Sequence, residues 1–352
     1  MNKKKRVIIV IGTHRSGSSA FTKGLTSMGV SLGDSLIGAN PYNQKGHWED
    51  FEFNKLNVSL LDFLGNRDQR IRAINEEERE RLCRHDFFCK ASDLLIQKIS
   101  DHKIFGIKNP NFSPLLPFWK KVFHANDIDL SFVITLRNPW NVATSSYFYL
   151  KTKDQEVAFW SWISYLLSCL EHSSGYDRII VEYQELLKDP AHQMQRVAHA
   201  LRLTINSEAL QEYCEEFIDP SLCHYQEEKK TLDNDCFYKK FAMEIYETLL
   251  SIAQDQTSFH DIGRLMHQWK KQFLQTDALL VMTEKNNLKI GKLEDIIFKR
   301  EQTIFNLGKM VNNQLYSIAD SCKKLHQKNL QIAFLEHHYE QCNQEIRLLT
   351  QQ

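Results

Sequence analysis

The sequence lacks the features that mark several broad classes of protein. Its 44 Lys and Arg residues match its 44 Asp and Glu residues, so the net charge indicates no general affinity for nucleic acid or anionic membranes. The eight cysteines form no CxxC pair and no metal-ligand spacing, which predicts reduced thiols in a cytoplasmic protein and no metal site. The N-terminal apolar run, residues 7–11, is too short for a signal peptide or a membrane span. These absences leave a globular protein whose binding sites must be local.

Short apolar runs rich in β-branched residues recur along the first half of the chain. Each run is apolar on both faces, which is typical of a buried parallel strand. Helical patterns lie between them, and this alternation predicts an α/β fold in which helices flank a parallel sheet. Ligands of such sheets lie at the carboxyl ends of the strands, so the loops after the first three strands form the expected site. The predicted strands are 6–11, 103–108, 130–136 and 178–182, and the predicted helices are 18–28, 50–64, 76–100, 139–150, 155–172 and 190–202.

The C-terminal part of the chain carries a different pattern. Residues 207–275 have helical patterns without strands, and from about residue 276 the composition shifts to Gln, Asn, Lys and Leu. A seven-residue period then makes every a position apolar, while four of the nine d positions are polar. This pattern predicts a coiled coil whose β-branched a residues favour a parallel dimer, and the alternative is a long helix folded back on the globular part. The a positions are Ile290, Ile297, Ile304, Val311, Ile318, Leu325, Ile332, Tyr339 and Ile346.

These patterns divide the chain into three expected parts. We expect an α/β core over residues 1–225, a helical extension over 226–275 and a coiled coil over 276–352. The coiled coil would either join two copies of the chain or dock it on a partner.

The first predicted strand is followed by the loop GTHRSGSS, residues 12–19, and then by a helical pattern. Its two glycines are five residues apart, as in loops that hold phosphate with backbone N–H groups at a helix N-terminus. Position 18, however, is serine where a nucleotide triphosphatase has lysine, and Arg15 is the strong cation. The loop therefore suits an oxyanion other than a triphosphate with Mg²⁺. Its candidate anion-binding residues are Gly12, Thr13, His14, Arg15, Ser16, Gly17, Ser18 and Ser19.

The third predicted strand ends in LRNPWNVATSSY, residues 136–147. Arg137 ends the strand, Pro139 opens a helix, and Ser145 follows about two helical turns after Arg137. A phosphate lying over the start of this helix would meet both Arg137 and Ser145. Taken alone, the pair favours the simpler interpretation of a surface salt-bridge arginine and a helix-face serine.

Together, the two loops resemble the sulfotransferases that use 3′-phosphoadenosine 5′-phosphosulfate. The family carries an N-terminal loop for the 5′-phosphosulfate, matched by residues 12–19, and an Arg…Ser pair eight residues apart for the 3′-phosphate, matched by Arg137 and Ser145. The segment VEYQELLKDP, residues 181–190, is similar to the family segment whose tyrosine, here Tyr183, approaches the adenine. The resemblance covers roughly residues 5–255 and implies sulfuryl transfer from this donor to a hydroxyl, without a metal. Cys223 departs from the pattern, because relatives commonly have arginine there.

The resemblance also implies which residues take part in the chemistry. Bacterial carbohydrate-type relatives use a glutamate as the base that removes the hydroxyl proton, and Glu49 matches it by position. His47, Asp50 and Glu52 are its rivals. Related enzymes often carry a lysine at the end of the second strand, so Lys108 is assigned to stabilising the leaving group, together with Arg15.

The acceptor suggested by the resemblance is a carbohydrate of a surface glycan or glycolipid. Trp48 and Tyr42 lie near the proposed base and are candidates for stacking on a sugar ring. Loops at 30–50, 65–75 and 113–125 are expected to select the acceptor. Two other functions stay open: a nucleotide or small-molecule kinase with a degenerate phosphate loop, and a non-catalytic coiled-coil assembly protein.

Overall fold

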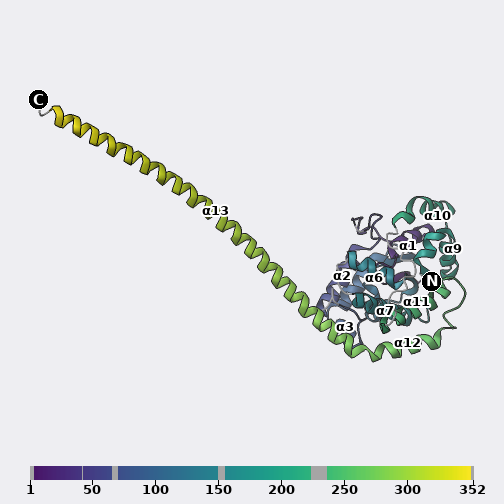
Figure 1. Ribbon diagram of the computed structural model, residues 1–352. Helices are drawn as coiled ribbons and strands as arrows, with labels where there is room; N and C mark the ends of the chain where they lie inside the picture. Colours follow the sequence, from purple (N-terminus) through teal and green to yellow (C-terminus); the bar gives the residue numbers. More distant parts are fainter. Residues whose placement is uncertain (1–3, 42, 66–69, 150–154, 223–235, 350–352) are drawn as a thin grey trace. The chain divides into compact units, whose positions relative to one another are not determined.

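The computed structural model describes residues 4–41, 43–65, 70–149, 155–222 and 236–349 (Figure 1). The chain divides into two compact units, Met1–Lys285 and Asn286–Gln352. The first unit is built around a parallel sheet, and the described residues of the second are helical. The boundaries expected at residues 225 and 275 remain predictions.

The sheet has the order β2-β1-β3-β4, with every neighbouring pair parallel. Its core strands are buried on both faces, and this explains why their sequences are continuously apolar instead of alternating. The predicted α/β fold is confirmed, and each predicted strand agrees with an observed one to within one residue at either end. The strands are β1 (Arg6–Gly12), β2 (Ile104–Lys108), β3 (Asp129–Leu136) and β4 (Asp177–Glu182).

Helices pack around the sheet and create two hydrophobic cores. The larger core includes Trp119 and Trp162, and the smaller one includes Phe21 and Met194. The helices of the N-terminal half are α1 (Ser18–Gly24), the 3₁₀ helix η1 (Leu25–Met28), α2 (Phe51–Phe63), α3 (Glu76–Arg84), α4 (Phe87–Ile99), α5 (Phe112–Ala125) and α6 (Pro139–Tyr149). Those that follow are α7 (Gln155–His172), α8 (Tyr183–Lys188), α9 (Pro190–Leu201), α10 (Ser207–Glu212), the π-helix η3 (Tyr213–Phe217), the 3₁₀ helix η4 (Pro220–Leu222), α11 (Phe237–Ala253), α12 (Gly263–Gln275) and α13 (Asp277–Leu349).

The expectation of an acceptor-selecting loop at 113–125 is wrong, because α5 occupies this segment and is largely buried. Two prolines obscured the helical pattern. Pro114 is in the first turn, where its missing N–H costs nothing, but Pro117 removes the N–H that would bond the carbonyl of Ser113. The hydroxyl of Ser168 on α7 donates to that carbonyl instead, at 2.8 Å. A side chain from another helix thus satisfies the group that the proline leaves open.

The first turns of α13 belong to the globular unit. Leu280 and Glu284 are buried there, and the Glu284 carboxylate accepts hydrogen bonds from the backbone N–H groups of Ile71 and Arg72, at 2.8 and 2.9 Å. It also pairs with the Arg72 guanidinium, at 3.2 Å. Asp277 at the start of α13 is the second carboxylate beside Arg72, at 3.1 Å.

Replacing Glu284 by alanine is expected to lower the free energy of unfolding by about 2–3 kcal/mol. Removing one partner of a buried ion pair typically costs about 3–5 kcal/mol, and Asp277 remains beside Arg72 and reduces the loss. Urea denaturation measures the change. Glu301→Ala, at an exposed position on the same helix, is the control and should leave the midpoint unchanged. An equal loss in both variants would contradict the anchoring role of Glu284.

In the part of the chain that the structure describes, no helix is long and apolar enough to cross a lipid bilayer.

Candidate active site

The carboxyl ends of the parallel strands meet at one edge of the sheet and surround a cavity of about 250 Å³. The loop after β1 forms one wall, Lys108 ends β2, and Arg137 and Tyr183 directly follow β3 and β4. This is the position where parallel sheets bind their ligands. The predicted site residues that line the cavity are His14, Arg15, Gly17, Ser18, Ser19, Glu49, Lys108, Arg137, Ser145 and Tyr183.

The loop after β1 is held in an unusual backbone conformation. Arg15 and Gly17 both have positive φ, 65° and 85°, a region that only glycine adopts without strain. At Gly17 a side chain is also excluded by space, because a Cβ would lie 2.1 Å from Cδ2 of Tyr183. Strained residues cluster at functional sites, where the surrounding structure enforces them.

Three predicted residues of this loop do not line the cavity and instead take part in contacts that support the loop. Ser16 is buried and its hydroxyl bonds to the carbonyl of Thr13 and the hydroxyl of Thr135, both at 2.7 Å. Gly12 exchanges two hydrogen bonds with the Ser113 hydroxyl on α5, at 3.0 and 2.6 Å. Thr13 is buried beside them. These hydrogen bonds therefore fix the shape of the loop.

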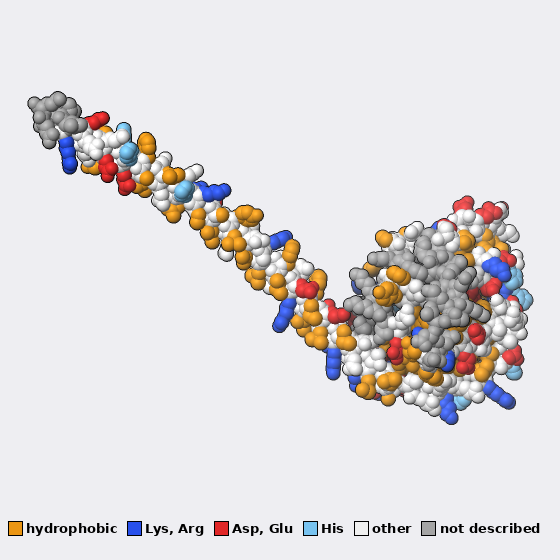
Figure 2. Space-filling view, viewed as in Figure 1, with side chains coloured by type: hydrophobic (Ala, Val, Ile, Leu, Met, Phe, Trp, Pro, Cys, Tyr) orange, Lys and Arg blue, Asp and Glu red, His pale blue; other side chains and the backbone are white. Residues whose placement is uncertain are grey.

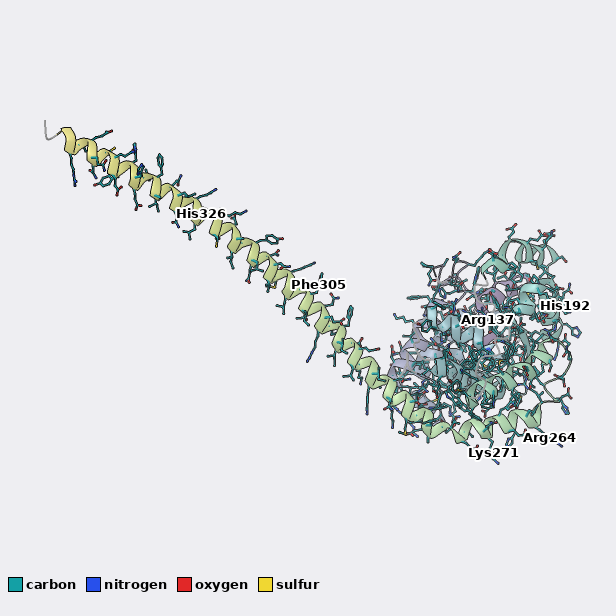
Figure 3. The ribbon with its side chains drawn as sticks, viewed as in Figure 1. Arg137, His192, Arg264, Lys271, Phe305 and His326 are labelled. Carbon is teal, nitrogen blue, oxygen red and sulfur yellow. The ribbon has the colours of Figure 1, made fainter. Side chains whose placement is uncertain are left out.

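Arg137, which is labelled in the globular unit in Figure 3, connects the loop after β3 to the loop after β1 through a hydrogen bond. Its Nη1 donates to the carbonyl of Arg15 at 3.0 Å, and its guanidinium lies 4.6 Å from the centre of the Tyr183 ring. Arg15 Nε in turn donates to the Ser145 hydroxyl on α6, at 2.9 Å. The two sequence motifs, more than a hundred residues apart, are thus in direct contact on one cavity.

Glu49 and Lys108, which also line the cavity, form a buried ion pair. Lys108 Nζ lies 2.6 Å from Glu49 Oε1, and it also donates to the Ser19 hydroxyl and the carbonyl of His47, each at 3.0 Å. The side chains of Lys108 and Glu49 are 3% and 10% exposed, so water barely screens the pair. The second Glu49 oxygen, Oε2, accepts from Asn109 Nδ2 at 2.7 Å.

Burial changes the pKa of three basic side chains at the cavity. It lowers the pKa of Lys108 from its ordinary value, against the opposing effect of Glu49. It also lowers the pKa of His14 and of His47, so both imidazoles are neutral at pH 7. The fixed cations that face the cavity at neutral pH are therefore arginine and lysine side chains.

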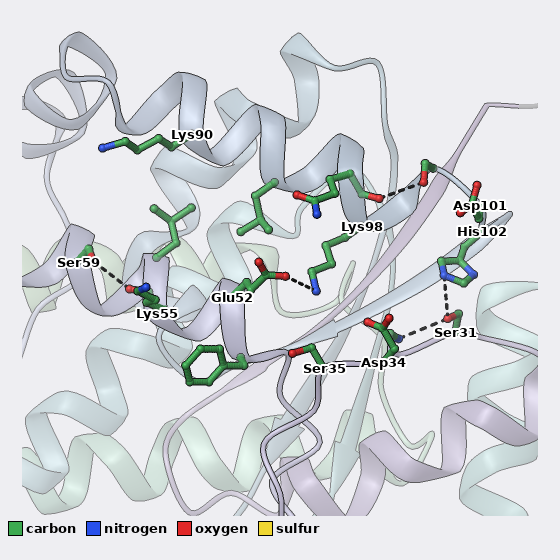
Figure 4. Close-up of a pocket in the computed structure, with 16 residues that line it drawn as sticks. Ser31, Asp34, Ser35, Glu52, Lys55, Ser59, Lys90, Lys98, Asp101 and His102 are labelled. Atoms are coloured by element: carbon green, nitrogen blue, oxygen red, sulfur yellow. Dashed lines mark hydrogen bonds and ion pairs between the residues drawn. The ribbon is translucent and has the colours of Figure 1, made fainter.

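Of the rivals of Glu49, Glu52 lines a different groove (Figure 4) and Asp50 is buried. Asp50 caps the N-terminus of α2 by accepting from the backbone N–H groups of Glu52 and Phe53. Lys98 on α4 pairs with Asp50 at 2.8 Å and with Glu52 at 2.5 Å. His47 does face the cavity, with Nδ1 3.9 Å from Glu49 Oε1.

The expected sugar-stacking role of Trp48 gains no support from its contacts. Its ring packs edge-on against Phe217, and Lys23 lies over it at 5.2 Å. Trp48 thus packs the segment before α2 against η3. Tyr42 and Cys223 lie outside the described residues.

Sequence reasoning missed Asn109 and Asn43. Asn43 Nδ2 donates to the Ser19 hydroxyl at 3.0 Å, and Asn109 holds Glu49. Asn109 follows Lys108 at the end of a strand, which is a signal that points to the site, whereas Asn43 lies in a loop with no such signal. Among the described residues, no group of three or more His, Cys, Asp or Glu side chains is placed to hold a metal ion.

Comparison with known proteins identifies the family. The model described as "Sulfotransferase family" matches residues 7–207, while no curated protein matches the chain. The sulfotransferase domain of the Synechococcus PCC 7002 olefin synthase is 14% identical, with 71% of this chain and 97% of that one covered and a TM-score of 0.43. Sulfotransferase STF1 from Mycobacterium tuberculosis H37Rv is 15% identical (63% and 74% covered, TM-score 0.38). Mouse sulfotransferase SULT7A1, complexed with PAP, is 14% identical (77% and 90% covered, TM-score 0.35). Because the family match spans more than half of the sequence, the chain belongs to the sulfotransferase family and is an enzyme of sulfuryl transfer.

Proposed function

We propose that this sulfotransferase takes its sulfuryl group from 3′-phosphoadenosine 5′-phosphosulfate and passes it to a hydroxyl of a carbohydrate. The observation that carries the proposal is that Arg15 and Arg137 contact each other and line the same cavity. The donor is anionic at both its 3′ and its 5′ end, so cations from two loops around one cavity suit a single molecule of it.

The groups around the cavity fit a sulfonated nucleotide better than a triphosphate with Mg²⁺. Ser18 and Ser19 line the cavity where a triphosphatase would have a lysine that spans its β and γ phosphates. A kinase would require that charge together with an acidic ligand for Mg²⁺. We therefore assign the loop after β1 to the 5′-phosphosulfate, Arg137 and Ser145 to the 3′-phosphate, and Tyr183 to the adenine side.

Glu49 is the proposed general base. It faces the cavity, whereas Asp50 and Glu52 pair with Lys98 in the other groove. The acceptor hydroxyl loses its proton to Glu49 as its oxygen bonds to sulfur, and the bond from sulfur to the bridging oxygen breaks with its electron pair on the phosphate. Lys108 and Arg15 stabilise the negative charge that develops there. The Glu49–Lys108 contact must loosen when the donor enters, because the donor offers Lys108 a second anion.

Hydrogen-bonding side chains at the cavity support a carbohydrate acceptor. Asn43, Gln44 and Asp219 line it with amide and carboxylate groups that suit a ligand with many hydroxyls. Incubating the enzyme with the donor and a panel of oligosaccharides, phenols and long-chain alcohols tests the acceptor class by mass spectrometry. Sulfation of the oligosaccharides is expected. Sulfation of phenols or alcohols alone would contradict the carbohydrate assignment and leave the sulfotransferase assignment intact.

We also propose that α13 joins two copies of the chain as a parallel coiled coil. Its residues from Ile290 to Ile346 lie in one unbroken helix, and hydrophobic side chains run along it (Figure 2). Each of the nine a-position side chains is more than half exposed in the single chain. Such a continuous apolar stripe is covered in solution, and the regular a positions of a second copy match it.

Ile318→Asp is expected to weaken the dimer, because it places a charge at a central a position. Leu330→Asp is the matched control: both side chains are 59% exposed in the single chain, but Leu330 is on the opposite side of the heptad. Light scattering after size exclusion gives the mass. A dimer for wild type and the control, with monomer for Ile318→Asp, is the expected result. A monomeric wild type, or equal effects of both changes, would contradict the proposed seam.

A cytoplasmic location is part of the same proposal. Scattered cysteines without paired spacing are typical of proteins that keep their thiols reduced. The donor and the enzyme would then both be in the cytoplasm, where the carbohydrate acceptor would be sulfated while it is assembled.

A further inference from the structure

A buried chain of side-chain amides runs from the core to Glu49. Trp119 Nε1 donates to Asn57 Oδ1 at 2.8 Å, and Asn57 Nδ2 donates to Asn109 Oδ1 at 3.3 Å. Asn109 Nδ2 then donates to Glu49 Oε2 at 2.7 Å and to Asn54 Oδ1 at 2.8 Å. Asn57 and Asn109 are at most 1% exposed, so water does not compete for these bonds.

The direction of each amide in this chain is determined by groups that can only donate. The indole N–H of Trp119 has no acceptor function, so Asn57 must turn its oxygen toward Trp119 and its nitrogen toward Asn109. The backbone N–H of Asn111 also donates to Asn109 Oδ1, at 2.9 Å. The donors from Asn57 and from the Asn111 backbone therefore both require the amide oxygen of Asn109 to point toward them. Asn109 must therefore present N–H, and never a carbonyl, to Glu49.

We propose that Asn109 is a positioning residue that holds Glu49 in the orientation of a general base. This inference rests on the proposed function, because it assumes that Glu49 accepts the acceptor proton. The N–H of Asn109 donates to Oε2 and so fixes the rotation of the carboxylate. Oε1, which contacts Lys108 at 2.6 Å, is then the oxygen directed to the reaction. Lys108, the cation assigned to the leaving group, and Asn109, the support of the base, are therefore neighbours in the sequence.

Asn109→Asp tests this role with almost no change of shape. The new carboxylate would lie beside Oε2 of Glu49, and two neighbouring carboxylates hold a shared proton to higher pH. We expect the acid limb of the pH profile of kcat/KM to move upward by about one pH unit or more. Near neutral pH, kcat should fall roughly 10- to 100-fold, as for other groups that orient a functional side chain. The deficit should shrink as pH rises.

Three further measurements separate positioning from other roles. Asn109→Ala, which adds no charge, should lower kcat with a smaller displacement of the acid limb. Asn126→Asp, which makes the same charge change at the end of α5, should leave the profile unchanged. Calorimetry with 3′-phosphoadenosine 5′-phosphate should give wild-type affinity for all variants, which also reports a folded site.

The outcomes of the proposed function and of this inference are distinguishable. Suppose that the wild type is active and that the pH profile of Asn109→Asp differs from the wild-type profile only by a constant factor. This result would overturn the positioning role of Asn109 and leave the proposed function intact. Loss of nucleotide affinity in parallel with kcat would also overturn it, because Asn109 would then maintain the cavity as a whole. Absence of sulfuryl transfer by the wild type would instead count against the proposed function.

Discussion

Replacing Arg137 by alanine is expected to weaken the binding of 3′-phosphoadenosine 5′-phosphate at least about 100-fold. An arginine can donate two hydrogen bonds to one phosphate, and each bond to a charged group contributes about 1.5–3 kcal/mol, where 1.4 kcal/mol is a factor of ten. Arg137 is 6% exposed and keeps its guanidinium over Tyr183, so the unbound enzyme already holds it in the cavity wall. Isothermal titration calorimetry measures the loss.

Arg178→Ala is the matched control for this experiment. Arg178 also lies over an aromatic ring, that of Phe259 at 3.9 Å, and it also donates to backbone, at the carbonyl of Leu170. Arg178 does not line the cavity, so Arg178→Ala tests whether the loss of any packed arginine lowers the affinity for the nucleotide. We expect wild-type affinity for this control. An Arg137→Ala enzyme that binds the nucleotide as tightly as wild type would remove Arg137 from the donor site.

Glu49→Gln is expected to lower turnover by roughly 10²–10⁴-fold while nucleotide affinity changes little, because general base catalysis contributes about that factor. Glutamine preserves the size of the side chain and an oxygen that can face Lys108. It cannot take the proton of the acceptor hydroxyl. Single-turnover rates at saturating donor, measured beside calorimetric affinity, separate the chemical step from binding.

The control is Glu52→Gln, three residues further along. Glu52 pairs with Lys98 in the other groove and is expected to keep full turnover. If Glu49→Gln retains wild-type turnover, the base is another group, and His47 is the remaining candidate beside the cavity. In that event His47→Gln should lose turnover where Glu49→Gln did not.

The sheet and the two loops that we propose as anion-binding were predictable from local sequence. Buried parallel strands need apolar residues on both faces, and this sequence has such runs at β1 and β3. The spacing from Arg137 to Ser145 likewise follows from one strand end and one helix. Such features depend on neighbours in sequence, so a single chain displays them.

Contacts between distant segments were not predictable in the same way. The helix α5 was hidden by Pro117, since the hydroxyl that satisfies Ser113 comes from Ser168 on another helix. Nothing in the local pattern indicates that Arg15 would bond to Ser145, or that Lys108 would pair with Glu49. The choice between Glu49 and Asp50 has a local clue, because an aspartate directly before a helix is a typical N-cap. As the N-cap, Asp50 accepts hydrogen bonds from the helix backbone, whereas Glu49 lines the cavity.

We infer that one sulfonated adenosine nucleotide contacts both the loop after β1 and Arg137. Calorimetric titration of the full chain with 3′-phosphoadenosine 5′-phosphate, beside ATP with Mg²⁺, tests it most directly. We expect one nucleotide per chain and clearly tighter binding of the bisphosphate. Tighter binding of ATP, dependent on Mg²⁺, would contradict it, and so would the absence of any binding by the bisphosphate.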